Sequence, residues 1–224
     1  MTGTFANAGA IIAGSLIGVS AGSRLPENIK TIVMQALGLS VVLIGLKMGL
    51  SGQDYMVAIG CVILGAITGE WIGIEQGIES LGTWLKRQTR SGSSTFVQGF
   101  ATASVLYLTG AMMIVGSIQD GTTGDANTLY IKSLLDGVAS IALSSTLGIG
   151  VAFSALSVFL IQGSITLLAS KLIFLQNPAV LDAITSSGGL LIMGIGTNLL
   201  GVTRIRIGNM LPAIFYAILW TMLR

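Results

Sequence analysis

The chain has 224 residues, of which 52% are hydrophobic and only 9% are charged, and its mean hydropathy is +0.86. Soluble domains carry about 25% charged residues, so a chain this poor in charge cannot cover its surface with polar groups and is expected to lie in a lipid bilayer. A net charge of +2 gives no reason to expect nucleic acid as a partner.

The scarcity of histidine and cysteine limits the chemistry further. There is no histidine, and the single cysteine, Cys61, lies in an apolar segment. A catalytic histidine, haem ligation and a soft metal site therefore lack their usual groups, and we predict neither an enzyme nor a bound cofactor. The identity of any metal is left open, but oxygen atoms would have to bind it.

The first half of the chain predicts three membrane-spanning helices, over residues 5–23, 29–50 and 54–74. No basic segment precedes the first helix and Asn7 interrupts its start, so we expect this helix to be retained rather than cleaved as a signal peptide. Residues 75–94 differ, because their apolar residues share one helical face and Lys86, Arg87 and Arg90 gather near the end. This pattern is typical of a short amphipathic helix at the membrane interface.

The second half predicts five more helices. The first of them covers residues 96–118 and leads into the polar stretch GSIQDGTTGD at 116–125. The apolar run from 131 to 175 would measure about 67 Å as one helix at 1.5 Å per residue, about twice the hydrocarbon thickness of a bilayer. We therefore place a turn at 148–150, between helices at 131–147 and 149–172, and further helices at 183–201 and 208–223.

Eight helices with both termini outside agree with the rule that positive charge collects on the cytoplasmic side. The cytoplasmic turns then hold Arg24, Lys30, Lys86, Arg87, Arg90, Arg204 and Arg206, whereas the outer side holds Lys47, Lys132, Lys171 and Arg224. GAIIAGSLIGVSAGSRLPENI and GGLLIMGIGTNLLGVTRIRIGN each give a glycine-rich helix, a basic turn and another helix, which suggests a weak internal repeat. The sequence thus predicts an all-α fold, with one integral membrane domain over 1–224, about eight tightly packed helices, and broken or re-entrant helices as an open alternative.

Glycines recur every four residues in two of the predicted helices. They are Gly14, Gly18 and Gly22 in the first helix and Gly65, Gly69, Gly73 and Gly77 in the third helix and just after it. This spacing places them on one helix face, which a neighbouring backbone can approach closely. The neighbour could belong to the same subunit, to the partner in a homodimer, or to a substrate path, and all three interpretations remain open.

Charged residues within or beside membrane helices are costly unless they are paired. Lys132 and Asp136 are four residues apart on one helix face, so they can pair locally. The predicted topology places Lys47, Asp120 and Asp125 at a similar outer depth. These five residues either form one charged cluster in an outward-facing vestibule or reach water separately.

Further candidate ligands lie elsewhere. Glu70, near the inner end of its helix, either pairs with Arg204 or Arg206 or binds a proton or cation. Amides that could form ligands or interhelical hydrogen bonds are Asn7, Gln35, Gln98, Gln119, Gln162, Asn198 and Asn209. The stretch at 116–125 matches neither an EF-hand nor a Walker loop. Its glycines at 116, 121 and 124 favour a sharp turn that exposes carbonyls, which suits a cation or ammonium site and a plain turn equally.

The stretch GAMMIVGSIQDGTTGD, followed by LYIKSLLDGVASIALSSTLGIGVAFSA and FLIQGSITLLA, resembles the YdfK/YqgA-type bacterial inner-membrane proteins, whose domain is one of unknown function (number 554). The glycine pattern after Asn7 and the sequence GLKM in the second helix are similar too, and the resemblance covers essentially the whole chain. It implies a multi-pass protein of the bacterial cytoplasmic membrane with a role in transport. It assigns neither a substrate nor site residues.

Taken together, these features favour a small secondary transporter or exporter of a small cationic or polar solute. Its site would lie between the helices at 96–118 and 131–147, with carboxylates binding the solute and amides orienting it: Asp120, Asp125, Asp136, Gln119 and Gln162. Glu70, Lys47, Asn7 and Asn198 complete the candidate residues. The alternatives are an oligomeric channel, in which a homodimer would use the glycine faces, and a scaffold that transports nothing. The substrate, the coupling ion and the direction of transport are left open.

Overall fold

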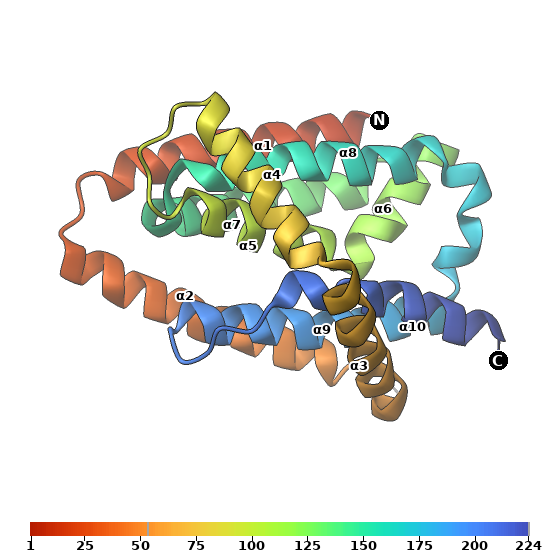
Figure 1. Cartoon of the computed structure of the whole chain (residues 1–224). Coiled ribbons are helices and arrows are strands. Elements are labelled where there is room, and N and C mark those ends of the chain that lie inside the picture. Colours follow the sequence, from red (N-terminus) through yellow and green to blue (C-terminus); the bar gives the residue numbers. More distant parts are fainter. Residues whose placement is uncertain (53, 224) are drawn as a thin grey trace. The chain divides into compact units, whose positions relative to one another are not determined.

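The computed structural model describes residues 1–52 and 54–223, and within those ranges all regular secondary structure is helical (Figure 1). This confirms the all-α class predicted from the sequence. Two residues lie outside the described ranges. They are Gln53, which follows the second predicted helix, and Arg224, which was counted among the outer charges. The chain divides into two compact units, which are described separately. The first comprises Met1–Met34, Glu79–Leu108 and Met112–Phe174, and the second comprises Gln35–Ile78, Thr109–Ala111 and Leu175–Arg224.

The first unit is built on three long neighbouring helices. They are α1 (Thr2–Gly22), α7 (Asn127–Leu147) and α8 (Ser154–Leu167). Figure 1 shows them running alongside one another. Gly3 of α1 lies beside Leu129, and Gly22 lies beside Ser145, so α1 and α7 are parallel. The same relation follows from the predicted topology, in which both helices run from the outside inward.

The 41-residue apolar stretch Asn127–Leu167 is folded back on itself. At Gly148 the backbone has φ 76° and ψ −162°, a combination that is essentially open to glycine alone. A short 3-10 helix, η1 (Gly148–Phe153), follows and leads into α8. Asn7 bonds to both Asp136 on α7 and Gln162 on α8, so the two helices lie antiparallel on either side of Gly148. The turn predicted at 148–150 is therefore confirmed.

The helix predicted over 96–118 is instead two helices, α5 (Phe96–Leu108) and α6 (Ala111–Thr122), bent by 66° at the break between them. This span is thus broken at Thr109 and Gly110, whereas at 148–150 the chain reverses. α6 also extends farther than predicted. Gly116 packs on Leu129 and Gly121 packs on the backbone of Thr166, and this close packing keeps both glycines helical despite their low helix propensity.

The glycine face of α1 packs against α7. A Cβ atom added to Gly14, Gly18 or Gly22 would overlap the carbonyl oxygens of Gly137, Ile141 and Ser145, respectively. Backbone thus meets backbone along this helix pair, which only glycine permits.

The second unit consists of most of α2 (Glu27–Gly49) together with α3 (Tyr55–Ile72), α9 (Pro178–Leu199) and α10 (Pro212–Leu223), the last preceded by a 3-10 turn, η4 (Ile207–Met210). The Asp54 side chain caps α3 by accepting from Val57 N. Asn177 caps α9 in the same way, with Pro178 at the first helical position. Both are usual helix-start signals.

Two helix pairs in the second unit are antiparallel. Along α2, Gly38 lies beside Leu200 and Gly45 lies beside Met193. Along α3, Gly65 lies beside Ala213 of α10, and Gly69 lies beside Asn209 in the turn that precedes α10. These directions again follow from the predicted topology.

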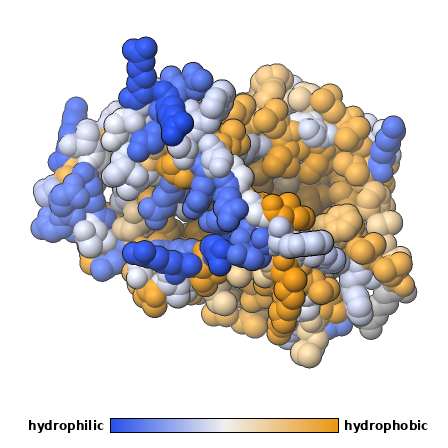
Figure 2. All heavy atoms as spheres, viewed as in Figure 1, coloured by the Kyte–Doolittle hydropathy of each residue, from blue (hydrophilic) through white to orange (hydrophobic). Residues whose placement is uncertain are grey.

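The amphipathic segment predicted over 75–94 forms α4 (Ile74–Gln88), which is separated from α3 by Gly73 in the left-handed conformation, with φ 77°. Figure 2 shows hydrophilic residues gathered along α4, whereas wide areas of the same face are apolar. Many large apolar side chains are exposed on other helices, such as Trp71 at 90% and Leu134 at 69%. Such a surface suits contact with lipid.

Among the described residues, five helical stretches are long and apolar enough to cross a membrane, and the bent pair of α5 and α6 makes a sixth. One of the five, Asn127–Leu167, is the folded pair of α7 and α8, and Ile207–Leu223 is a shorter apolar helix. These segments are together consistent with the predicted bundle of about eight helices.

Candidate functional site

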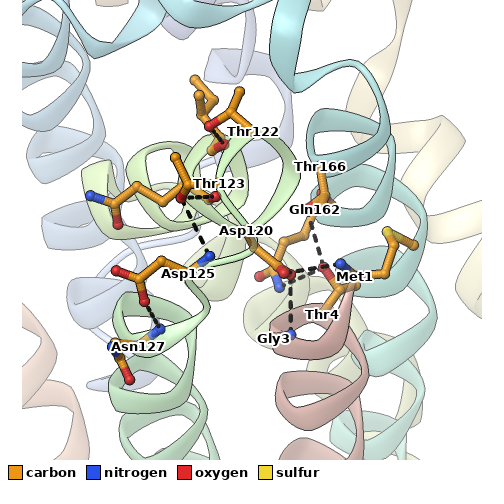
Figure 3. A network of polar contacts seen from close by, with 12 residues as sticks. Met1, Gly3, Thr4, Asp120, Thr122, Thr123, Asp125, Asn127, Gln162 and Thr166 are labelled. Atoms are coloured by element: carbon orange, nitrogen blue, oxygen red, sulfur yellow. Dashed lines mark hydrogen bonds and ion pairs between the residues drawn. The ribbon is translucent and has the colours of Figure 1, made fainter.

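A buried polar network links α1, α7 and α8 in the first unit. Asn7 Nδ2 donates to Asp136 Oδ2 at 3.0 Å and to Gln162 Oε1 at 3.1 Å. Gln162 Nε2 in turn donates to Thr4 Oγ1 at 3.2 Å, and Thr4 Oγ1 lies 3.3 Å from Thr166 Oγ1 (Figure 3). Asn7, Gln162 and Thr4 are fully buried. Three helices thus contribute polar side chains to one enclosed place.

The spacing of these residues along their helices explains why they meet. Thr4 and Asn7 are three residues apart on α1, and Gln162 and Thr166 are four apart on α8, so each pair lies on one helix face. The close packing of α1 on α7 brings the short Asn7 side chain within reach of Asp136. The polar network is therefore assembled by the glycine face of α1.

A charged pair adjoins the network. Lys132 Nζ forms an ion pair with Asp136 Oδ2, and the two side chains are only 7% and 12% exposed. The Lys132 ammonium also lies 5.8 Å from the centre of the Tyr107 ring, within the range of a cation–π interaction. The Tyr107 hydroxyl is 2.8 Å from Ser140 Oγ. Tyr107 is the penultimate residue of α5, so the network reaches the helix end at which the span breaks.

Asp120, on α6, holds the start of α1. Its Oδ2 accepts from the backbone N of Gly3 at 3.1 Å, and its Oδ1 lies 3.0 Å from the α-ammonium of Met1. The side chain of Asp120 is 3% exposed. A carboxylate in this place accepts from the free N–H groups of a helix start and interacts favourably with the helix dipole.

One acceptor of the network has no donor. Asn7 Oδ1 is buried and has no hydrogen-bond partner among the residues that the structure describes. A buried polar atom left unpaired costs about 1–3 kcal/mol. Such an atom marks a place where a donor or a cation would be stabilising.

The other predicted residues of the first unit lie at its edge. Asp125 is exposed, and its carboxylate accepts from Asn127 N at 3.0 Å, which is an ordinary turn (Figure 3). Gln119 is half-buried and accepts from Thr128 Oγ1 at 2.7 Å. The sharp turn predicted from the glycines at 116, 121 and 124 is found only at Gly124, because α6 continues to Thr122 and Gly124 alone of the three glycines has a positive φ.

Three predicted residues belong to the second unit and are described apart from the network. Glu70 bonds to Arg206 at 2.5 Å and accepts from Asn209 Nδ2 at 2.6 Å, which is the salt bridge predicted as one of its two roles. Asn198 accepts from Ile205 N at 2.8 Å and so holds the turn after α9. Lys47 is exposed near the end of α2. Of the expected five-residue outer cluster, the structure therefore brings Lys132 and Asp136 into direct contact.

Sequence reasoning missed Thr4, Thr166, Tyr107 and Ser140. The two threonines could have been predicted from spacing, because Thr4 lies one helical turn from Asn7 and Thr166 lies one helical turn from Gln162, and both amides were predicted site residues. Nothing in the sequence pointed to Tyr107. Across residues 1–52 and 54–223, no group of three or more His, Cys, Asp or Glu side chains could hold a metal ion.

The second unit has a separate cavity of about 500 Å³, lined by residues that include Asp54, Asp182, Ser186 and Trp220. Asp54 already serves there as the cap of α3. The first-unit network is the stronger candidate site, because its polar groups are buried and one of them lacks a partner.

Comparison with known proteins places the chain in a family. Residues 2–222 match the family model described as a protein of unknown function (DUF554). The chain belongs to this family. It is similar to the uncharacterized membrane protein YdfK of Bacillus subtilis (strain 168), with 32% identity over 96% of this chain and 93% of the relative. It is also similar to the uncharacterized protein YqgA of Escherichia coli (strain K12), with 27% identity over 96% and 94%. No solved structure matches.

The DUF554 match confirms the resemblance stated from the sequence and its extent over the whole chain. Together with the apolar helices of spanning length and the membrane relative, it identifies a multi-pass membrane protein. The first-unit network is thus a feature of a DUF554 chain whose surroundings are largely lipid.

Proposed function

We propose that this DUF554 protein is a small secondary transporter of a small cationic or polar solute, and that the network around Asn7, Asp136 and Gln162 is its solute site. The observation that supports the proposal most directly is the unpaired, fully buried Asn7 Oδ1 next to the buried ion pair of Lys132 and Asp136.

A structural role alone gives little reason for such a pair. Charged residues inside membrane helices are expensive and tend to mark ion or substrate paths. Replacing a buried ion pair by apolar residues of similar volume is often neutral or stabilising. The presence of a lysine and a carboxylate in the interior of an apolar bundle therefore favours a function for them.

The break between α5 and α6 supports the same proposal. Transporters commonly place their sites beside discontinuous helices, whose freed backbone groups line the path in the protein interior. Here the 66° bend follows directly after Leu108, one residue beyond the tyrosine that lies over the Lys132 ammonium.

The chemistry of the site favours a cation or a hydrogen-bond donor over an anion. Asn7 Oδ1, the Asp136 carboxylate and Gln162 Oε1 are all acceptors, and the Lys132 ammonium is already paired. A solute that carries a positive charge or N–H donors would satisfy the unpaired Asn7 Oδ1 and interact favourably with the Asp136 carboxylate, whereas an anion would be repelled by that carboxylate.

The test is a thermal-stability screen of the detergent-solubilised protein against alkali cations, amines, amino acids and organic acids. A ligand at 100 times its Kd stabilises the folded state by about 2.7 kcal/mol. We expect a stabilising solute whose effect disappears in Asp136→Asn and in Asn7→Ala but persists in Asp125→Asn, the exposed matched control. The same solute should show saturable uptake into proteoliposomes that falls in Asp136→Asn.

Other results would favour the alternatives. Single-channel currents without saturable uptake would indicate a channel. A protein partner that co-purifies, with neither flux nor stabilisation by any solute, would indicate a scaffold. The transporter proposal is abandoned if Asp136→Asn and Asn7→Ala leave both uptake and stabilisation unchanged.

A further inference from the structure

We infer that the solute is a primary ammonium compound, and that the Lys132 side chain occupies its place at Asp136 until the solute displaces it. This inference rests on the proposed transport function and narrows it to one substrate class. It makes Lys132 an internal competitor of the solute, and not one of the groups that hold it.

The surroundings of the Lys132 ammonium are those that a primary ammonium group needs. Its Nζ pairs with the Asp136 carboxylate and lies 5.8 Å from the centre of the Tyr107 ring. A carboxylate together with an aromatic face is a usual way to bind an alkylammonium group. The side chain of Lys132 is itself an alkylammonium, so the structure shows such a group bound in this place.

The unpaired acceptor shows that the hydrogen-bonding capacity of the network is not fully used. A primary ammonium has three N–H donors. Asp136 Oδ2 and Gln162 Oε1 both accept from Asn7 Nδ2, while Asn7 Oδ1 accepts from nothing among the described residues. Half a turn of the Asn7 amide would exchange its nitrogen and oxygen, so that Nδ2 gives up its two bonds and takes the unpaired position while Oδ1 turns toward Asp136 and Gln162. Three acceptors, one each from Asn7, Asp136 and Gln162, would then face one place and match three N–H donors.

Once displaced from Asp136, the Lys132 side chain can extend toward the aqueous interface. Lys132 is the sixth residue of α7, close to the helix end that begins at Asn127. Long lysine side chains near the ends of membrane helices extend toward the aqueous interface. Withdrawal along the helix would carry the Lys132 charge toward water while the solute ammonium replaces it at Asp136.

The remaining charged groups near α7 do not take part. Asp120 is occupied by Gly3 N and the Met1 ammonium at the start of α1. Asp125 lies in the exposed turn before α7. Within the described first unit, Asp136 is thus the carboxylate that the Lys132 ammonium contacts.

The experiment measures the binding of methylammonium to the purified full-length protein by isothermal titration calorimetry, with tetramethylammonium, sodium and potassium as comparison ions. Methylammonium has three N–H donors and tetramethylammonium has none. We expect methylammonium to bind the wild type, and tetramethylammonium and the alkali cations to bind at least tenfold more weakly.

The decisive variant is Lys132→Met, which keeps the length of the side chain and removes the competitor. We expect its Kd for methylammonium to fall at least tenfold, whereas Lys171→Met, which removes an exposed lysine, should leave the Kd unchanged. A lysine that only stabilises the fold would not give a gain of affinity. Lys132→Arg keeps the ion pair and therefore the fold, and its bidentate guanidinium should raise the Kd at least tenfold.

The results separate this inference from the proposed function. Equal binding of tetramethylammonium, Asp136-dependent binding of alkali cations alone, or a loss of methylammonium affinity in Lys132→Met would overturn the inference and leave the transporter proposal standing. If Lys132→Met does not fold, an unchanged Kd in Lys132→Arg overturns it. If no solute of any class binds or is transported, both proposals fail.

Discussion

Replacing Lys132 by methionine removes the cation of a buried ion pair and leaves the Asp136 carboxylate inside the first unit. The two side chains are 7% and 12% exposed, and breaking a buried pair by removing one partner costs about 3–5 kcal/mol. Asn7 still donates to Asp136 at 3.0 Å, so the remaining charge keeps one hydrogen bond. Because Lys132 and Asp136 lie one turn apart on α7, they can also pair in an isolated helix. Both effects place the expected loss of unfolding free energy at the low end of this range, at about 3 kcal/mol.

Two further variants show whether burial causes this loss. Lys30 pairs with Glu27 at 2.7 Å, but its partner is 87% exposed. Exposed pairs contribute about 0–1 kcal/mol, so Lys30→Met should change little. Combining Lys132→Met with Asp136→Leu removes both charges, and we expect the double variant to regain wild-type stability or exceed it by up to about 4 kcal/mol.

The free energy of unfolding is measured by titrating the protein from mild detergent into sodium dodecyl sulfate, with tryptophan fluorescence and circular dichroism as probes, in a buffer free of amines. If Lys132→Met lowers the free energy of unfolding no more than Lys30→Met does, the argument that Lys132 and Asp136 form a buried ion pair is refuted. A double variant as unstable as the single one would show that packing, and not charge, determines the loss.

Three other predictions concern the α1–α7 contact, the backbone at Gly148 and the topology. Gly18→Leu should disrupt the packing of α1 on α7 and lower the free energy of unfolding by at least about 1–3 kcal/mol in the same assay. Gly9→Leu should be tolerated, because Gly9 is exposed and nothing lies within 4 Å of a Cβ added there. Equal losses in the two variants would contradict the close contact. Gly148→Ala should cost about 1–3 kcal/mol because of its backbone conformation, and a smaller change would argue against the fold-back there. In a cysteine-free background, a cysteine at Asp125 should react with an impermeant maleimide added outside intact cells, and one at Arg87 only after permeabilisation; the reverse pattern would invert the predicted topology.

The features that could be predicted from the sequence depend on local spacing. The Lys132–Asp136 pair follows from a four-residue separation on one helix. The reversal at Gly148 follows from an apolar run too long for one crossing. The pairing of Glu70 with Arg206 followed from the predicted topology, which placed both residues on the same side of the membrane.

The features that could not be predicted depend on contacts between distant segments. A single glycine within an apolar run is tolerated in a helix, so Gly110 gave no sign that the span breaks there. Conversely, Gly116 and Gly121 read as turn residues, yet contacts with Leu129 and Thr166 keep them in α6. The bonds from Asn7 join residues separated by 129 and 155 positions, and no local pattern specifies such pairings.

The glycine face of α1 and the polar network also restrict how the first unit could move. Gly14, Gly18 and Gly22 bring α1 into backbone contact with α7, and close-packed surfaces of this kind leave no room for sliding. The helices that hold Asn7 and Asp136 should therefore stay together while a solute enters or leaves. The span formed by α5 and α6 is already interrupted by a 66° bend, and it carries Tyr107 over the Lys132 ammonium. If the site opens to alternate sides of the membrane, we expect this broken span to move and the α1–α7 pair to remain fixed.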